Sequence, residues 1–160
     1  MKRIIPLVLA CTLLLASCHR SNVVYDETHT FAGNVWNHFT AEQFDIDISN
    51  VEDYYNVDFV AEVDTALFRY DRLTLRVEMS NPAGEQRQWY YTLPLKENGR
   101  WRGQVHDGYR AVQGRARSYF TFNHRGSHQM EVFQMAGPYD LEGVHSIAVK
   151  VEKTKLDYSM

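Results

Sequence analysis

The chain has 160 residues, of which 44% are hydrophobic, 13% aromatic and 23% charged, and its formal net charge at pH 7 is −3. This composition is typical of one globular domain and excludes collagen-like, low-complexity and disordered classes. The charge balance provides no polycationic surface, so we expect no nucleic acid among the partners. Valine, isoleucine, tyrosine, phenylalanine and threonine dominate the apolar stretches, which favours strands over helices.

The N-terminal segment has the order of a lipoprotein signal peptide. Lys2 and Arg3 give a positive start, and residues 4–15 form an apolar stretch too short to span a ~30 Å hydrocarbon core. Leu15-Ala16-Ser17-Cys18 follows and resembles the lipobox of bacterial lipoproteins, in which the cysteine thiol receives the lipid before cleavage. The alternative is an ordinary secretory signal cut near Ser17, which would leave Cys18 as a free thiol.

The cysteine count agrees with lipid attachment. Cys11 lies in the apolar stretch and leaves with the signal, so the mature chain keeps Cys18 alone and forms no intrachain disulfide. We therefore predict a signal peptide over residues 1–17, a lipidated tether over residues 18–22 and one domain over residues 23–158, with residues up to about Glu27 leading into it. A lipid on Cys18 would anchor the domain to a membrane.

Alternation of apolar and polar residues with a period of two recurs through the rest of the chain and predicts strands. The predicted strands cover residues 44–48, 57–64, 72–80, 86–95, 101–105, 118–123, 129–135 and 144–152. The strand over residues 72–80 is the most regular and ends at the turn Asn81-Pro82-Ala83-Gly84. A hairpin is expected around Glu97-Asn98-Gly99, where asparagine and glycine favour a tight turn. We expect residues 36–39 and 109–114 to form loops or short turns.

About eight short strands with regularly spaced turn signals predict an all-β fold, a single antiparallel two-sheet β-sandwich behind the signal peptide. Gly103 follows Trp101 by two residues, which suggests a bulge or a close backbone approach beside a large ring.

Patterns typical of catalysis or metal binding give no strong candidate. His124 and His128 lack cysteine ligands or a third histidine nearby, which favours solvated loop histidines over a metal site. Asp45 and Asp47 have a spacing that a glycosidase pair could use, but on an alternating strand such residues more often form the solvated face. The sequence has no Gly-x-Ser-x-Gly elbow, no P-loop and no dinucleotide-binding glycine pattern. We therefore expect no metal, no cofactor and no enzymatic activity.

Aromatic side chains are the candidates for a binding surface. A platform that stacks on sugar rings could use Trp89, Trp101 and Tyr109, together with Tyr90, Tyr91 and Tyr119. Core packing is the favoured alternative, because Trp89 and Tyr91 share one face of their strand while Tyr90 takes the other. Trp101 likewise has two interpretations, a core residue of the hairpin or an exposed tip that binds a partner.

Short motifs follow one another in a distinctive order from residue 81 to the C-terminus. They are Asn81-Pro82-Ala83-Gly84, Leu93-Pro94-Leu95, Gly99-Arg100-Trp101-Arg102-Gly103, Gln134-Met135 and the segment from Leu141 to Lys153. Together with the lipobox, this order resembles the GldH family of gliding-motility lipoproteins of Bacteroidetes. The resemblance implies a non-enzymatic envelope lipoprotein of the gliding apparatus and the linked type 9 secretion system, with a scaffold or assembly role. The implied partners are the membrane, through Cys18, and other proteins of that machinery.

Two further expectations accompany this resemblance. No acidic cluster follows Cys18, and in Bacteroidetes lipoproteins such a cluster tends to accompany display on the cell surface, so we expect a domain that faces the periplasm from the outer membrane. The alternative function, from a different class, is a glycan-binding envelope lipoprotein that uses exposed aromatic residues, and an enzyme ranks third.

Overall fold

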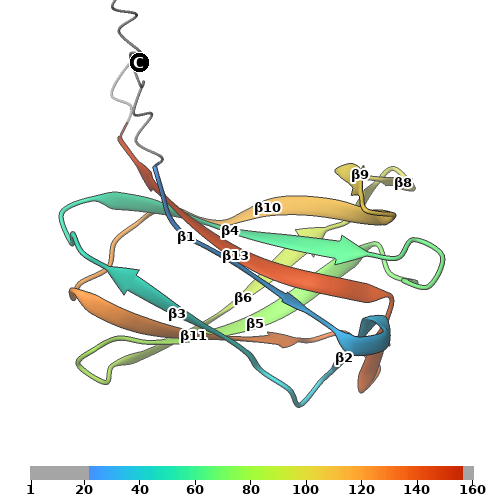
Figure 1. Cartoon of the computed structure of the whole chain (residues 1–160), viewed down its shortest axis with the longest axis horizontal. Coiled ribbons are helices and arrows are strands. Elements are labelled where there is room, and N and C mark those ends of the chain that lie inside the picture. Colours follow the sequence, from blue (N-terminus) through green and yellow to red (C-terminus); the bar gives the residue numbers. More distant parts are fainter. Residues whose placement is uncertain (1–21, 157–160) are drawn as a thin grey trace, which may run out of the picture.

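The computed structural model describes residues 22–156, which form two antiparallel sheets packed face to face (Figure 1). The five-stranded sheet has the order β1 (Val23–Thr30), β13 (Val144–Thr154), β4 (Tyr54–Val63), β10 (Tyr109–Phe120) and β9 (Gln104–His106). The four-stranded sheet has the order β3 (Glu42–Ile48), β11 (Gly126–Gln134), β5 (Arg72–Ser80) and β6 (Gln86–Pro94). The predicted all-β two-sheet sandwich is confirmed.

Two short ribbons and one helical turn complete the described fold. β2 (Val35–Asn37) pairs with β12 (Asp140–Glu142), and β7 (Lys96–Glu97) pairs with β8 (Arg100–Trp101). The 3₁₀ turn η1 (Ala32–Asn34) joins β1 to β2. In the part of the chain that the structure describes, no helix is long and apolar enough to cross a membrane.

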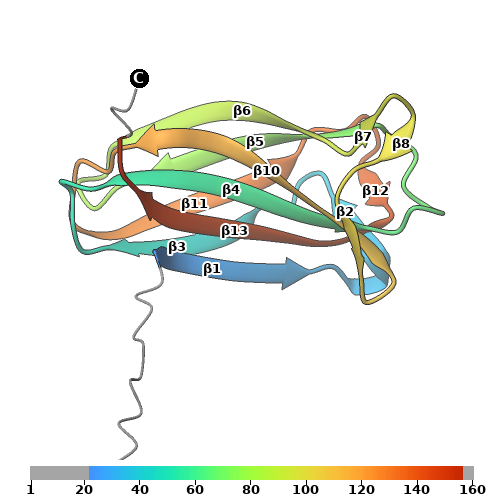
Figure 2. The same ribbon diagram turned by 90° about the horizontal axis from the view of Figure 1, so that it is seen from above.

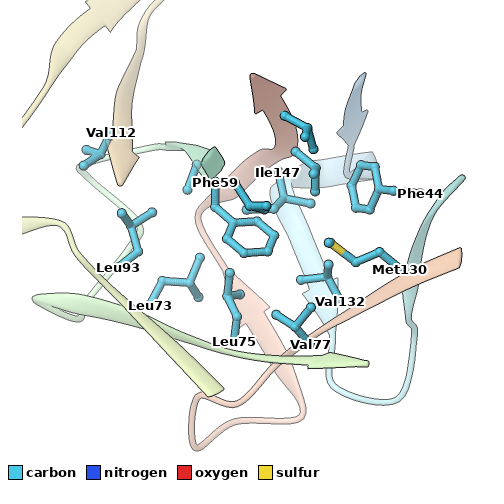
Figure 3. Close-up of a cluster of buried hydrophobic side chains, with 14 of the residues drawn as sticks. Phe44, Phe59, Leu73, Leu75, Val77, Leu93, Val112, Met130, Val132 and Ile147 are labelled. Atoms are coloured by element: carbon cyan, nitrogen blue, oxygen red, sulfur yellow. The ribbon is translucent and has the colours of Figure 1, made fainter. Parts of the chain in front are cut away.

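The core lies between the two sheets and follows from the alternation of the strands. In β5, Leu73, Leu75 and Val77 are fully buried, while the residues between them face outward. These side chains meet Phe59 of β4, which is also fully buried and lies in the middle of the cluster drawn in Figure 3. Burial of one such side chain contributes about 1.5–3 kcal/mol, so the inward faces of both sheets hold the sandwich together.

The loops divide between the two ends of the sandwich, because antiparallel strands send successive connections to opposite ends. One end carries the start of β1 and three compact connections, residues 49–53, 81–85 and 121–125, and we refer to it as the short-loop end. The other, the long-loop end, carries residues 31–41, 64–71, 95–108 and 135–143, which include both short ribbons (Figure 1).

Several predicted boundaries are wrong. Residues 109–114, expected as a loop, begin the twelve-residue strand β10 and pair with β4. In residues 36–39, Trp36 belongs to strand β2 and is fully buried. Residues 23–27, expected to lead into the domain, instead form most of β1 (Val23–Thr30), which pairs with β13 along its length. The sequence did not predict β1 or the start of β10, because their many polar residues give no alternating apolar pattern. Main-chain pairing with β13 and β4 defines these strands.

The glycine and turn predictions explain where other strands end. Asn98 and Gly99 have φ angles of 51° and 75°, so the predicted tight turn is confirmed. It joins β7 to β8 and not the strands predicted over residues 86–95 and 101–105, because β6 pairs with β5. The strand predicted over residues 101–105 is interrupted at Gly103, where φ is 69° and a side-chain Cβ would overlap the carbonyl oxygen of Ala111. The strand predicted over residues 118–123 instead ends at Phe120, after Tyr119 with a φ of 52°.

Candidate functional site

The predicted lipid attachment site, Cys18, lies outside the described residues. The described chain begins at Asn22, whose carbonyl oxygen accepts a hydrogen bond from the backbone N–H of Lys153 at 2.7 Å. β1 then starts at the short-loop end, so any group attached upstream of Asn22 is joined to the domain at that end (Figure 1). The long-loop end lies at the opposite side of the sandwich.

Trp89 lies on β6 and faces the other sheet. Its ring centroid is 6.4 Å from that of Phe120 on β10, and the guanidinium carbon of Arg117 lies 5.1 Å from the centroid. The indole Nε1 is buried and has no hydrogen-bond partner within residues 22–156. On the same face of β6, Tyr91 stacks on Phe59 at 5.8 Å, and burial raises the pKa of the Tyr91 hydroxyl.

Tyr90 points the other way and is 60% exposed. The predicted division of this strand into an inward face and an outward face is therefore confirmed.

Trp101 lies on β8 at the margin of the core, against which it packs while half-buried. The ammonium group of Lys96 lies 4.5 Å from the centroid of the Trp101 ring and pairs with Asp71 at 3.0 Å. Trp101 also lines an open depression, together with Glu97, Asn98, Arg100 and Arg102.

Both the ring and the hydroxyl of Tyr109, at the start of β10, contact neighbouring side chains. Its ring stacks on His145 at 3.7 Å with the planes 5° apart, and its hydroxyl accepts a hydrogen bond from Asn34 Nδ2 at 3.4 Å. Asn34 Oδ1 also lies 2.9 Å from His145 Nδ1. Trp89, Trp101 and Tyr109 thus pack against different elements, and the structure does not bring them together as one platform.

A pair of exposed aromatic residues that the sequence did not single out lies at the long-loop end. Phe39 is 73% exposed and Tyr139 is 69% exposed, and their rings stack at 5.4 Å. The ribbon of β2 and β12 holds them, because the backbone N–H of His38 donates to the Tyr139 carbonyl oxygen at 2.6 Å. We call Phe39 and Tyr139 the exposed aromatic pair. The sequence carries no signal for this pair, because Phe39 and Tyr139 are distant in the chain and meet only through the pairing of β2 with β12.

Large exposed apolar residues concentrate at this same end. Six of the eight such residues in the described chain belong to the long-loop end, namely Val35, Phe39, Leu67, Tyr70, Val105 and Tyr139. The other two are Tyr90 and Tyr119. Exposed aromatic and apolar residues that gather on one part of a surface are typical of binding sites.

The carboxylate of Glu62, on β4 next to the long-loop end, has two polar side-chain partners. It accepts a hydrogen bond from Ser146 Oγ at 2.8 Å and contacts His106 Nδ1 at 2.6 Å. This hydrogen bond raises the pKa of His106. Because the carboxylate stands between the serine and the histidine, the histidine is not placed to accept the serine proton, as a nucleophilic site requires. The cluster instead links β4, β13 and β9.

A second histidine links the two sheets at their β1 and β3 edges. His29 of β1 contacts Glu27 at 2.9 Å and Glu42 of β3 at 2.7 Å, and its ring stacks on Phe44 at 4.3 Å. Burial lowers the pKa of His29, but the hydrogen bonds to the two glutamates outweigh burial, so the pKa lies above its ordinary value. Burial, together with the hydrogen bond that the Tyr25 hydroxyl donates to Glu27, raises the pKa of Tyr25.

The two histidines considered for a metal site occupy different environments. His124 lies half-buried in the loop of residues 121–125, where its Nδ1 is 3.1 Å from Asn81 Nδ2. His128, expected to be a solvated loop residue, is buried on β11, where its ring meets Phe122 edge-on at 4.9 Å and Nδ1 contacts the Gly126 carbonyl oxygen at 3.1 Å. Burial lowers its pKa. Within residues 22–156, no group of three or more histidine, cysteine, aspartate or glutamate side chains could hold a metal ion. Asp45 and Asp47 lie on the exposed face of β3, as expected.

These features define a β-sandwich protein that presents most of its large exposed apolar residues on the loops of one end. Comparison with known families agrees with the motif order: the family model of the GldH lipoprotein matches residues 23–151, from the first residue of β1 into β13. The chain belongs to the GldH lipoprotein family. It is therefore a member of a family of membrane-anchored envelope lipoproteins. No curated protein matches the chain.

Proposed function

We propose that this lipoprotein is a non-enzymatic scaffold or assembly component of the gliding-motility and type 9 secretion apparatus. In this proposal a lipid on Cys18 anchors the chain in the outer membrane, and the domain faces the periplasm. Two or more acyl chains give stable anchoring, because each buried CH₂ contributes ~0.8 kcal/mol.

The observation that carries the proposal is the position of the exposed apolar residues relative to the point of anchoring. A lipid upstream of Asn22 joins the domain at the short-loop end, and six of the eight large exposed apolar residues lie at the long-loop end. The long-loop end is thus free to meet other envelope proteins while the short-loop end stays near the membrane. Aromatic anchors among polar residues are the usual centres of protein interfaces.

Glycan binding is the second candidate. The exposed aromatic pair favours it, because stacked, open rings can pack against the apolar C–H faces of sugars. Next to the rings lie the polar side chains of Asn37 and Asp140, and Asn37 Nδ2 donates to Asp140 Oδ1 at 2.7 Å. Amide and carboxylate groups of this kind can form hydrogen bonds with sugar hydroxyls.

The test replaces both members of the exposed aromatic pair, Phe39→Ala with Tyr139→Ala, in cells that lack the wild-type gene. The matched control is Tyr119→Ala, because Tyr119 is 46% exposed but lies at the short-loop end. We expect the double variant to lose secretion and co-isolation with proteins of the secretion core, while the control keeps both. Normal secretion together with lost binding to envelope polysaccharide would favour the glycan function instead.

A further inference from the structure

The outer edge of β6 is an unprotected strand edge. β6 is the last strand of the four-stranded sheet, and within residues 22–156 no strand pairs with its other side. In Figure 2 it runs along one margin of the sandwich. Such an edge presents a row of unpaired main-chain groups that another polypeptide can use for hydrogen bonds.

The ladder between β5 and β6 shows which main-chain groups point outward. The Leu95 N–H donates to the Asp71 carbonyl oxygen at 2.9 Å, and the Asn81 N–H donates to the Glu85 carbonyl oxygen at 3.0 Å. Pairing between these two points runs without a register shift, so the odd-numbered residues of β6 bond to β5. The N–H and C=O groups of Gln88, Tyr90 and Thr92 therefore point away from the sheet.

Pro94 occupies the next outward position of the same row. A proline lacks the N–H, and within sheets it is found at edge strands where that group would face solvent. Its carbonyl oxygen accepts a hydrogen bond from Arg102 at 3.1 Å. The available row thus extends from Gln86 through Gln88 and Tyr90 to Thr92, and it ends at Pro94.

The other edges of the described sandwich carry features that oppose strand addition. β3 carries the charged residues Glu42, Asp45 and Asp47, and charges on an edge strand oppose pairing. β1 carries Asp26 and Glu27, and its His29 contacts Glu42 of β3. β9 has three residues. The free part of β10 has two register shifts near its arginines, and bulges of this kind disrupt a ladder. β6 has nine residues, an unbroken register and one charged residue, Arg87.

Three arginines border this edge, while the carboxylates beside it, Glu78 on β5 and Glu85 in the turn before β6, already bind Arg76 at 3.1 Å and Asn81 at 2.7 Å. Arg87 lies on β6, Arg117 on the neighbouring β10 lies over the Trp89 ring, and Arg102 lies at the Pro94 end. Within the described chain none of these three arginines forms an ion pair with a carboxylate. A second copy of this chain paired through β6 would bring two basic sides together, which disfavours self-pairing. An acidic segment would complement them.

We propose that the β6 edge binds an extended, acidic segment of another polypeptide, which adds as a fifth strand to the four-stranded sheet. Main-chain hydrogen bonds to Gln88, Tyr90 and Thr92 provide the affinity, and the arginines select for negative charge. This inference rests on the proposed scaffold function, because it assigns to the scaffold a surface for one class of protein partner. It is separate from the exposed aromatic pair, so the two surfaces can be tested independently.

The test uses the full, processed lipoprotein in detergent and a synthetic peptide as long as β6 that alternates valine with glutamate and threonine. The matched control peptide has lysine in place of glutamate. We expect the acidic peptide to bind at least about tenfold more tightly than the basic one at low salt, and this preference to fall as salt screens the arginines. Residue-resolved amide exchange should show that the acidic peptide protects Gln88, Tyr90 and Thr92.

Two substitutions at one position separate main-chain recognition from side-chain recognition. Tyr90→Pro removes an outward N–H without removing a bond to β5, whereas Tyr90→Ala removes the ring and keeps the N–H. We expect Tyr90→Pro to weaken peptide binding roughly tenfold or more and Tyr90→Ala to change it by less than about threefold. Thr92→Pro repeats the test if Tyr90→Pro does not fold, as judged by amide exchange at Trp89 and Tyr91.

Three results would overturn the inference. They are equal binding of the acidic and basic peptides, binding that Tyr90→Ala abolishes and Tyr90→Pro preserves, and dimerisation of the lipoprotein through β6. If peptide binding behaves as expected while the exposed aromatic pair proves dispensable for secretion, the edge is a binding surface and the scaffold function fails. If the secretion test succeeds and peptide binding fails, the scaffold function stands and its partner binds elsewhere.

Discussion

Replacing Trp36 and Trp101 separately with alanine tests how the two rings are packed. Trp36 is fully buried, stacks on Phe31 at 4.8 Å and donates from Nε1 to the Thr40 carbonyl oxygen at 3.1 Å. Truncation of a fully buried large aromatic residue costs ~3–5 kcal/mol, so Trp36→Ala should remove a large part of a typical stability of ~5–15 kcal/mol. Trp101 is half-buried at the core margin, so we expect Trp101→Ala to cost about 2 kcal/mol, of which the contact with Lys96 provides ~0.5–1 kcal/mol.

Thermal melts of the purified variants measure the difference directly. For a domain of this size, 1 kcal/mol shifts the Tm by roughly 3–4 °C, so Trp101→Ala should lower the Tm by about 6–8 °C and Trp36→Ala by about 10 °C or more. Arg100→Ala is the control, because this exposed neighbour of Trp101 should change stability by less than about 0.5 kcal/mol. An unchanged Tm for Trp101→Ala, or equal shifts for the two tryptophans, would refute this description of the packing.

Three other predictions concern the anchor, the independence of the fold from metal or disulfide, and pH. Cys18→Ser should leave an unlipidated precursor, because it removes the thiol that we expect to carry the lipid. Normal lipid labelling of this variant would contradict the assignment of Cys18 as the anchor. The domain should keep its β-type circular dichroism in chelator and reductant, and loss of the spectrum in either would reveal a missed metal or disulfide. The raised pKa of His29 means that its contribution to stability is complete below its ordinary value of 6.5 and is lost as pH rises through the raised value. Urea unfolding from about pH 5 to pH 8 should therefore show a decline that Glu42→Gln reduces, and equal pH dependence in wild type and variant would contradict the assignment.

The strands that the sequence predicted are those whose burial alternates strictly. Residues 72–80 match β5 because one face meets the core and the other meets solvent. β10 was missed at its start because Gln113 and Arg115 face outward to bond Asp58, and Gly114 lies against Tyr91, so no apolar alternation is visible. β1 was missed because it is an edge strand rich in polar residues, held by main-chain bonds to β13.

Features that depend on three-dimensional neighbours were out of reach of the sequence. His128 looked like a solvated histidine, yet the Gly126 carbonyl oxygen and the Phe122 ring give it a buried place. Phe39 and Tyr139 are far apart in the chain and come together through pairing of β2 with β12. The open edge of β6 depends on the order of the sheet, which strand patterns alone do not define.

The most direct test of the scaffold account is photocrosslinking in living cells from a photoreactive phenylalanine analogue in place of Tyr139, compared with the same analogue in place of Tyr119. Both native tyrosines are exposed, but they lie at opposite ends of the sandwich. The account predicts crosslinks to proteins of the gliding and secretion machinery from position 139 and none to those proteins from position 119. Crosslinks from position 139 to glycan-uptake proteins alone, or the same secretion proteins from both positions, would contradict it.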